Sequence, residues 1–412
     1  MIPNKTLFAL FLGLVLALTG NGQIPELRTW LETPASERQP INELPFAEKP
    51  LTKSEAETAA ALLLADHQAT LIRQYEKQWD DRKLEYRDFE MPFFYQVFGE
   101  EPADGRSLFI SLHGGGGAPP AVNDQQYKNQ QHLYDATMQG LEGVYLAPRA
   151  PTNEWDLWHK DHIDAFLNII IQLAVIKEKV NPNKVYLLGY SAGGDGVYQL
   201  APRTSDRWAA AAMMAGHPNE TTPMGLRNLP FMIQVGALDD GYDRSGVAKK
   251  WGADLDELAA NDPGHYLHET HLYEGLGHWM ERKDAIALPW MQKFTRNSLP
   301  QKVVWRQDNV LHSRFYWLGV PKELAREKGE MIVEYHPDRN EINVLSSYSQ
   351  TIHLYLNDEM LDLDKPVTIK AEGKVVFEGR IERTIQTIYG SVKAKGDPHL
   401  VFSGLYELTR ND

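Results

Sequence analysis

The 412-residue sequence contains no cysteine. This absence excludes disulfides, thiolate metal sites and cysteine nucleophiles. Basic residues are also scarce relative to acidic ones, because 42 Lys and Arg stand against 56 Asp and Glu and leave a net charge of -14 at pH 7. Nucleic acids and anionic membrane surfaces are bound through basic patches. The charge balance therefore argues against both as partners.

Long apolar runs are also lacking, except near the N-terminus. Lys5 precedes an almost unbroken apolar run over residues 7–18, and the small residues Gly20 and Gly22 stand three and one positions before a potential cut ahead of Gln23. The run is shorter than the roughly 20 residues that span a bilayer. It predicts a cleavable signal peptide over residues 1–22, and a periplasmic or secreted protein with no integral membrane span after cleavage. An uncleaved anchor is the alternative.

The segment after the signal peptide is predicted to be an N-terminal extension over residues 23–90. Residues 23–50 are rich in Pro, Glu and Thr with little periodicity, which predicts an extended linker. Thr52 and Glu55 form a capping-box pattern that opens a long helix to about residue 83. We expect this helix to pack on the main domain.

The main domain, residues 91–299, alternates strand and helix patterns. Strands are expected near residues 93–98, 107–112, 144–146, 185–188, 209–213, 231–235 and 268–273, with helices over 162–179, 244–260 and 283–296. Such alternation predicts an α/β domain with a mainly parallel sheet covered on both faces. In these folds ligands bind beyond the carboxyl ends of the strands, so the loops there are the candidates for a site.

One of those loops reads Gly-Tyr-Ser-Ala-Gly over residues 189–193, between an apolar strand pattern and a potential helix. A serine at the tip of a sharp strand-to-helix turn has almost no room beside it, so glycine is needed two positions before and after. The helix that follows presents its positive end to the same place, which suits a developing oxyanion. The pattern predicts Ser191 as a nucleophile.

A serine nucleophile needs a base and an acid that orients the base. His278 follows the last predicted strand and is the predicted base. Asp239, Asp240 and Asp243 all follow the strand before it, and Asp239 has the commoner spacing after that strand. Asp239 is the favoured acid, with Asp240 as the alternative. Three other histidines compete in composition, but they lie in or before the last strand: His265, His268 and His271.

A run of four glycines follows His113 over residues 114–117. Glycine lets backbone N–H groups approach a substrate oxygen, and no Lys-Ser or Lys-Thr follows that would indicate a phosphate site. Gly115 is predicted as one oxyanion donor, with Gly114 and Gly116 as alternatives, and Ala192 as the other donor.

Further side chains near the expected site are weaker candidates. Trp155, Trp158 and His217 follow strands on the same side of the sheet and are predicted to touch substrate, although packing roles are equally open. His159 and His162 are three positions apart, but no third ligand accompanies them. No metal and no cofactor are predicted.

Four motifs together carry a resemblance: Leu-His-Gly-Gly-Gly from Leu112, Asn-Pro-Asn-Lys-Val-Tyr from Asn181, Ser-Ala-Gly-Gly from Ser191, and Gly-His ending at His278. Residues 107–296 resemble the α/β-hydrolase fold, and within it the secreted polyhydroxybutyrate depolymerase-like and feruloyl-esterase-like carboxylesterases. The resemblance implies Ser191 as nucleophile, His278 as base and Asp239 as acid. Many members of that branch carry cysteines around these motifs, and this chain has none.

Residues 300–412 lie outside the resemblance and change character. Short runs alternate apolar and polar residues with turn residues between them, which predicts a small antiparallel β domain, a sandwich with one short helix. The domain could bind polysaccharide, cover the entrance to the site or support the fold.

Taken together, the sequence predicts an exported serine hydrolase that cleaves a small-molecule or polysaccharide-linked carboxylic ester through an acyl-enzyme. The alternatives are a serine peptidase of the prolyl-oligopeptidase kind and a non-catalytic scaffold whose β domain binds a glycan or another protein. No oligomeric state is predicted.

Overall fold

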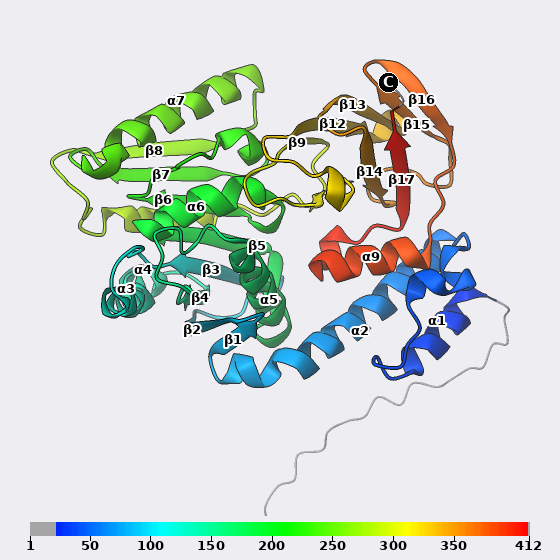
Figure 1. Ribbon diagram of the computed structural model, residues 1–412, viewed down its shortest axis with the longest axis horizontal. Helices are drawn as coiled ribbons and strands as arrows, with labels where there is room; N and C mark the ends of the chain where they lie inside the picture. Colours follow the sequence, from blue (N-terminus) through cyan, green and yellow to red (C-terminus); the bar gives the residue numbers. More distant parts are fainter. Residues whose placement is uncertain (1–21, 411–412) are drawn as a thin grey trace, which may run out of the picture.

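The computed structural model describes residues 22–410. It contains an N-terminal helical extension, a central α/β domain and a C-terminal β domain. The α/β and β domains lie side by side along the long axis of the molecule, and the extension runs beneath them (Figure 1). The predicted signal peptide lies outside the described residues, except for Gly22. Among the residues described, no helix has the length and apolarity needed to cross a bilayer.

The central domain is built on an eight-stranded sheet with the order β1-β2-β4-β3-β5-β6-β7-β8. The strands are β1 (Lys83–Tyr86), β2 (Phe89–Phe98), β3 (Arg106–Leu112), β4 (Gly143–Pro148), β5 (Val180–Tyr190), β6 (Ala210–Met214), β7 (Phe231–Gly236) and β8 (His268–Tyr273). The pairs β1–β2 and β2–β4 are antiparallel, and the pairs from β4 through β8 are parallel. The predicted α/β class with a mainly parallel sheet is confirmed.

Helices cover both faces of this sheet. They are α3 (Pro120–His132), α4 (Asp135–Met138), α5 (Asp161–Lys177), α6 (Ala192–Arg203), α7 (Arg244–Asn261) and α8 (Ala287–Met291). Alternate residues of β3 enter different cores, with Leu108 and Ile110 in one and Phe109 in the other. Helices α5, α6 and α7 contribute to the first core, and α4 and α8 to the second. This coverage explains why β4, β6 and β7 are buried at every residue.

One helix prediction in this domain is wrong, and one helix was not predicted. The single helix expected over residues 283–296 is a 3-10 turn, Lys283–Ile286, followed by the five-residue α8. Pro289 lies in the first turn of α8, where its missing N–H is tolerated, whereas a continuous helix would have needed that donor. Helix α3 was not expected, because its sequence is almost entirely polar and gives little apolar periodicity.

The N-terminal extension differs from the expected linker. Residues 23–50 form α1 (Gln23–Glu32) and two 3-10 turns, Ile41–Glu43 and Pro45–Glu48. Their apolar side chains are buried against α2 (Lys53–Asp80) and α9 (Ile385–Lys395), which accounts for the order that local sequence did not predict. The capping box of α2 at Thr52 and Glu55 is confirmed.

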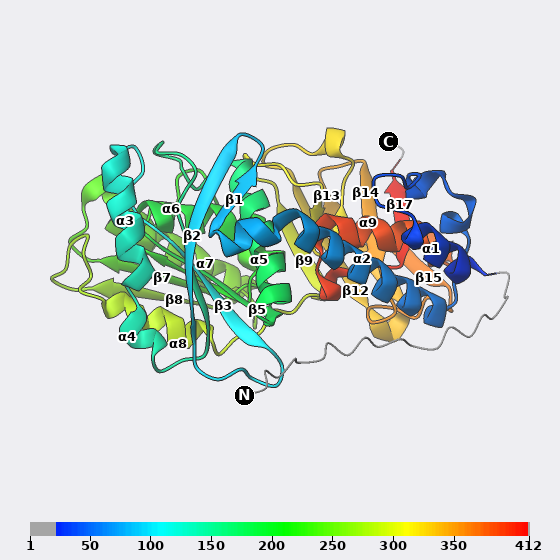
Figure 2. The same cartoon turned by 90° about the horizontal axis from the view of Figure 1, so that it is seen from below.

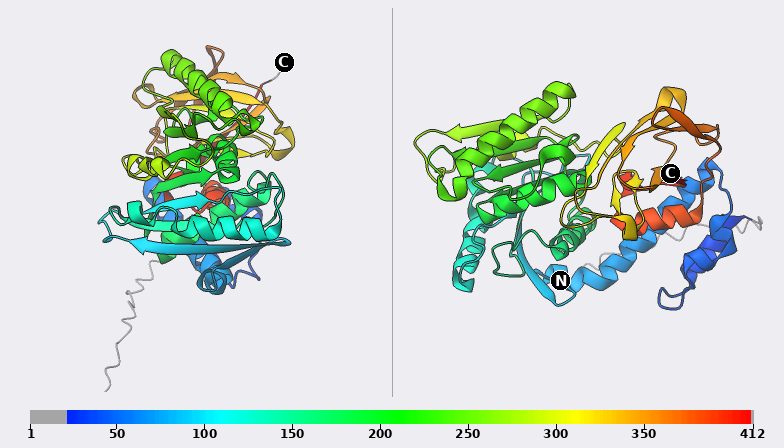
Figure 3. Two further views of the ribbon diagram at one scale, coloured as in Figure 1. Left: turned by 90° about the vertical axis from the view of Figure 1, so that its left-hand side faces the viewer. Right: turned by 45° about the horizontal axis from the view of Figure 1, so that its top comes forward.

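Helix α2 joins the two domains rather than packing on the central one alone. Its first half, including Ala59 and Leu63, lies in a core shared with Ile388 of α9. Its second half, including Tyr75 and Trp79, lies in the core of the central sheet. Figures 2 and 3 show α2 running from the C-terminal domain to β1.

The C-terminal domain is β-rich and mainly antiparallel, as predicted. One sheet has the order β10-β11-β14-β17 and the other β16-β15-β13-β12-β9, with a shared apolar core. The strands are β9 (Lys302–Arg306), β10 (Arg314–Phe315), β11 (Leu318–Gly319), β12 (Glu330–His336), β13 (Glu341–Ser347), β14 (Thr351–Leu356), β15 (Val367–Ala371), β16 (Lys374–Gly379) and β17 (Gly404–Thr409). One pair, β13–β15, is parallel, because the chain passes through β14 of the other sheet between them.

Buried ion pairs hold the C-terminal domain on the central one. Asp397 accepts from Arg296 at 2.8 Å and from Arg207 at 3.1 Å. Lys395 lies 2.9 Å from Asp206, whose carboxylate also accepts the N–H of Tyr316. The two domains therefore meet over paired, buried charges.

Candidate functional site

The predicted strand-turn-helix around Ser191 is present. Strand β5 ends at Tyr190, α6 begins at Ala192, and Ser191 between them has φ 58° and ψ -122°. A Cβ atom at Gly189 would lie 2.2 Å from the carbonyl oxygen of Gly193. Glycine is therefore required at that position, and the strained serine stands at the tip of the turn.

Ser191, His278 and Asp239 lie in one hydrogen-bonded chain. His278 Nε2 is 2.9 Å from Ser191 Oγ, and His278 Nδ1 is 2.7 Å from Asp239 Oδ2. A carboxylate can only accept, so Nδ1 carries the hydrogen and Nε2 is left to accept from the serine hydroxyl. Asp239 is 3% exposed, whereas the alternative acid Asp240 is exposed and makes no contact with His278. Two of the competing histidines bind other acids: His268 binds Asp256 and His271 binds Glu269.

The residue before the serine positions the histidine loop. The hydroxyl of Tyr190 donates to the carbonyl oxygen of His278 at 2.6 Å and accepts the N–H of Met280 at 3.0 Å. Tyr190 was not among the predicted site residues, because its place beside the serine in the sequence does not show where its hydroxyl points.

The second oxygen of Asp239 faces a residue that the sequence analysis also missed. Arg244 Nη1 lies 3.6 Å from Asp239 Oδ1, and its side chain is largely buried. Nη1 also donates to the carbonyl oxygen of Gly241 at 3.1 Å. Arg244 therefore places a guanidinium beside the carboxylate oxygen of Asp239 that does not contact His278.

The glycine run after β3 is held by Asn123 of α3. Its Oδ1 accepts the N–H of Gly116 at 2.9 Å, and its Nδ2 donates to the carbonyl oxygen of Ala118 at 3.1 Å. Gly115 has φ +114°, and a Cβ there would lie 2.0 Å from Asn123 Oδ1. The N–H of Gly116 therefore already donates to Asn123. The sequence offers no signal for Asn123 beyond a polar residue in a polar helix.

Comparison with known proteins gives matches in structure alone. No family model matches the sequence, and no curated protein matches it. The chain is similar to the solved structure of a thermostable esterase, with 18% identity, a TM-score of 0.41, and coverage of 52% of this chain and 64% of that one. It is also similar to an acetyl xylan esterase from Aspergillus awamori, with 13% identity, a TM-score of 0.38, and coverage of 49% of this chain and 93% of that one. A third similar structure is a ferulic acid esterase, with 15% identity, a TM-score of 0.33, and coverage of 50% of this chain and 99% of that one.

The central domain has the α/β-hydrolase fold. The strand order, the sharp turn at Ser191 and the chain order of serine, acid and histidine are the features of this chain that define it. The predicted resemblance is confirmed at the level of fold.

Two cavities of the α/β-hydrolase domain meet at Ser191 and Gly115. The larger, of about 710 Å³, lies between α3 and the segment after β8, and includes His278 and Trp279 in its wall. The smaller, of about 380 Å³, is lined by Gly116, Gly117, Ala192 and the loops after β4, β6 and β7. A substrate centred on Ser191 would extend in both directions.

Two of the three residues predicted to touch substrate line a cavity beside Ser191, and one does not. Trp155 and His217 line the smaller cavity. Trp158 lines neither of these cavities, and of the two roles left open for it the packing role is the one observed. Its indole is fully buried, donates its N–H to the carbonyl oxygen of His113 at 2.9 Å and packs over Gly196. It supports the glycine run from behind.

Asp195, four residues after the serine, also lines the smaller cavity and was not predicted. Its Oδ1 accepts the N–H of His217 at 2.6 Å. Burial raises the pKa of Asp195 to about 6. The smaller cavity therefore contains a carboxyl group that changes charge near neutral pH.

The paired histidines of α5 and the preceding loop do not form a metal site. The ring of His162 stacks on Phe89 with 4.0 Å between centroids, and burial lowers the pKa of His159 to about 4. Across residues 22–410, no group of three or more His, Asp or Glu side chains is placed to hold a metal ion.

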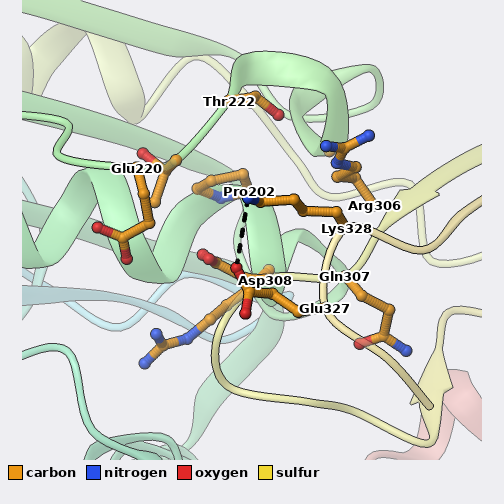
Figure 4. A pocket seen from close by; sticks show the side chains of 11 residues that line it. Pro202, Glu220, Thr222, Arg306, Gln307, Asp308, Glu327 and Lys328 are labelled. Carbon is orange, nitrogen blue, oxygen red and sulfur yellow. Dashed lines mark ion pairs between the residues drawn. The ribbon is translucent and has the colours of Figure 1, made fainter.

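A separate small cavity lies between the two domains. Pro202 and Glu220 line it from the α/β-hydrolase domain, and Arg306 and Asp308 from the C-terminal domain (Figure 4). Charges of both signs face one another there, including Lys328 and Glu327 at 3.8 Å. With a volume of about 40 Å³, it has room for only a few water molecules.

Proposed function

We propose that the protein hydrolyses carboxylic esters through an acyl-enzyme on Ser191. The observation that carries this proposal is the continuous chain from Ser191 Oγ to His278 to the buried Asp239, with distances of 2.9 and 2.7 Å. A serine hydroxyl is a poor nucleophile without a base. His278 supplies that base, and Asp239 orients it and stabilises the imidazolium that forms.

In the first step Ser191 Oγ attacks the ester carbonyl carbon while His278 Nε2 takes the serine proton. The tetrahedral intermediate collapses when the bond to the alcohol oxygen breaks, and His278 returns the proton to that oxygen. Water then attacks the acyl-serine with the same base, releasing the acid and restoring Ser191. No cofactor takes part in this scheme.

Gly115 and Ala192 are the proposed oxyanion donors. Ala192 is the first residue of α6, where a helix leaves its N–H groups without intrahelical partners. Gly115 borders both cavities beside Ser191, and its neighbour Gly116 donates its N–H to Asn123 instead. These features favour Gly115 over Gly116, and the helix dipole adds to the stabilisation.

The main alternative is a peptidase of the prolyl-oligopeptidase kind. A peptide requires protonation of a poor amine leaving group and firm registration of the chain, which such enzymes achieve with a β-propeller ahead of the hydrolase domain. Within residues 22–410, two α-helices precede the first strand, and the β domain that follows consists of two small sheets. This arrangement supports ester rather than amide substrates.

The test is a panel of aryl, alkyl and sugar esters with matched prolyl and dipeptidyl amides. Short-chain aryl esters should turn over, and Ser191→Ala should lower kcat by about 10⁴-fold or more. Ser205→Ala, a buried serine at the end of α6, is the control and should retain activity. Amide cleavage with kcat/KM equal to that of esters would favour the peptidase. No turnover of any ester would favour the non-catalytic scaffold.

We also propose export, which the apolar run at residues 7–18 and Gly22 support. The mature chain should begin at or near Gln23. N-terminal sequencing of protein recovered from the periplasm or medium checks this, and membrane-bound protein that retains Met1 would contradict it.

A further inference from the structure

The two cavities beside Ser191 differ in charge. The wall of the larger one includes two cationic side chains, Lys128 and Arg282, and no Asp or Glu. In the smaller one Arg244 is accompanied by Asp195. A wall whose charged side chains are all cationic is unexpected in a chain whose net charge is -14. This contrast indicates that the larger cavity receives a group of defined charge.

The two long basic side chains there are available to a ligand. Lys128 comes from α3 and Arg282 from the segment after His278, and both are exposed. Within residues 22–410 neither forms an ion pair. Acids near this wall have other partners: Asp135 lies 3.0 Å from His132, and Asp124 lies 3.0 Å from Arg149. A substrate anion would therefore meet unpaired cations from two elements.

The place of His278 identifies which end of the ester enters this cavity, given the proposed function. His278 Nε2 must hand its proton to the alcohol oxygen as that oxygen leaves. His278 lines the larger cavity and not the smaller one. The alcohol part therefore lies in the larger cavity and the acyl part in the smaller one.

We propose that the preferred substrates are esters whose alcohol part carries a carboxylate, which Lys128 and Arg282 bind. The guanidinium of Arg282 can donate two N–H groups to the two oxygens of a carboxylate, while Lys128 adds a point charge. Hydroxy acids and uronic acids are the two sources of such an alcohol, and a cavity of about 710 Å³ accommodates either.

The test compares two chromogenic esters with the same acetyl group: 5-acetoxy-2-nitrobenzoate, whose leaving phenol carries a carboxylate, and the matching neutral carboxamide. In the double variant Lys128→Gln/Arg282→Gln, the ratio of kcat/KM for the carboxylate over the carboxamide should fall about tenfold, as expected for two solvent-exposed charge contacts. The carboxamide should be hydrolysed within about twofold of the parent rate. The control Lys249→Gln/Lys250→Gln removes the same charge from exposed positions on α7 and should leave the ratio unchanged.

Salt provides a second readout with the unaltered protein. The preference for the carboxylate ester should shrink between low salt and about 0.5 M NaCl, since exposed charges are screened. O-acetylated hydroxybutyrate and O-acetylated galacturonate then separate the two sources, by which one loses more kcat/KM in the double variant. A ratio unaffected by the double variant overturns this inference and leaves the ester hydrolase intact. Failure of both chromogenic esters in the parent protein would instead overturn the proposed function.

Discussion

Asn123 accepts the backbone N–H of Gly116 at 2.9 Å and thereby determines which amides of the glycine run remain for a ligand. The asparagine is fully buried, and its Nδ2 donates to the carbonyl oxygen of Ala118 on the other side of the bend. It thus bridges two points of a loop in which residues 115–117 are glycines with positive φ. Glycine loses more conformational freedom on folding than any other residue, so such a loop needs contacts that fix it.

Replacing Asn123 with alanine should loosen this loop and misplace the Gly115 N–H. We expect kcat to fall by roughly ten- to a hundredfold with KM changed less, because loss of an oxyanion donor outright costs about 10²–10³-fold. Steady-state kinetics on an aryl ester measure the effect. Gln125→Ala, at an exposed position of the same helix, is the control. Equal losses in kcat for the two variants would contradict the role given to Asn123.

The two adjacent acids after β7 should respond very differently to amidation. Asp239→Asn replaces the acceptor of His278 Nδ1–H, so the imidazole loses its orienting partner, and we expect kcat to fall by about 10⁴-fold. Asp240→Asn alters an exposed side chain and should change kcat by less than about threefold. The same kinetic assay compares both variants, and the reverse ranking would transfer the role to Asp240.

The local motif at Ser191 could be predicted because its requirements are local. A Cβ at position 189 or 193 would lie little more than 2 Å from a backbone carbonyl oxygen, so the motif follows from steric exclusion within a few residues. His278 and Asp239 could be predicted from their positions after consecutive strands, since parallel strands bring their carboxyl ends to one edge.

Other features depend on where a side chain points across separate elements. Tyr190 acts through a contact with the distant His278, whereas Asn123 and Arg244 reach back across a loop to Gly116 and Asp239. Neither periodicity nor composition encodes the direction of these side chains. The position of Trp158 after a strand is compatible both with lining a cavity and with packing behind it, and the sequence does not distinguish the two. The helix and 3-10 turns of residues 23–50 likewise depend on burial against α2 and α9.

The buried Asp195 should make stability depend on pH. Its pKa rises from 3.8 to about 6 in the folded protein because of burial, so between about pH 4 and 6 the folded state holds the proton more tightly than the unfolded one. Its contribution to the free energy of unfolding therefore falls as pH rises through that window and stays lower above it. Asp195→Asn should be more stable than the parent at pH 7.5 by up to about 3 kcal/mol, since one pKa unit is about 1.4 kcal/mol.

That stability difference should vanish near pH 4, where the parent carboxyl is protonated as well. Urea denaturation at the two pH values measures it. Asp338→Asn, at an exposed position in the C-terminal domain, should change stability by less than about 0.5 kcal/mol at both. A pH-independent effect of Asp195→Asn would show that the carboxyl is already ionised across the range.

The ion pairs at Asp397 lead to a prediction about how the two domains stay together. Burial alone would raise the pKa of Asp397, but Arg296 and Arg207 lower it overall, so the carboxylate is charged in the folded protein. Asp397→Asn would leave two guanidinium groups, each under 10% exposed, without their shared anion.

Removing one partner of a buried pair costs about 3–5 kcal/mol, because the remaining charge is left uncompensated. Asp397→Asn should therefore lower the free energy of unfolding at pH 7 by several kcal/mol, and it should separate the unfolding of the C-terminal domain from that of the α/β-hydrolase domain. Asp362→Asn breaks an exposed pair with Lys365 in the same domain and should cost less than about 1 kcal/mol.

The folded pKa of Asp397 is depressed, so its contribution to the free energy of unfolding is present above the unfolded value near 3.9 and is lost as pH falls below it. Urea denaturation followed by tryptophan fluorescence, at pH 7 and near pH 3, checks both points. Equal effects of the two substitutions at pH 7 would mean that the buried charges do not hold the domains together.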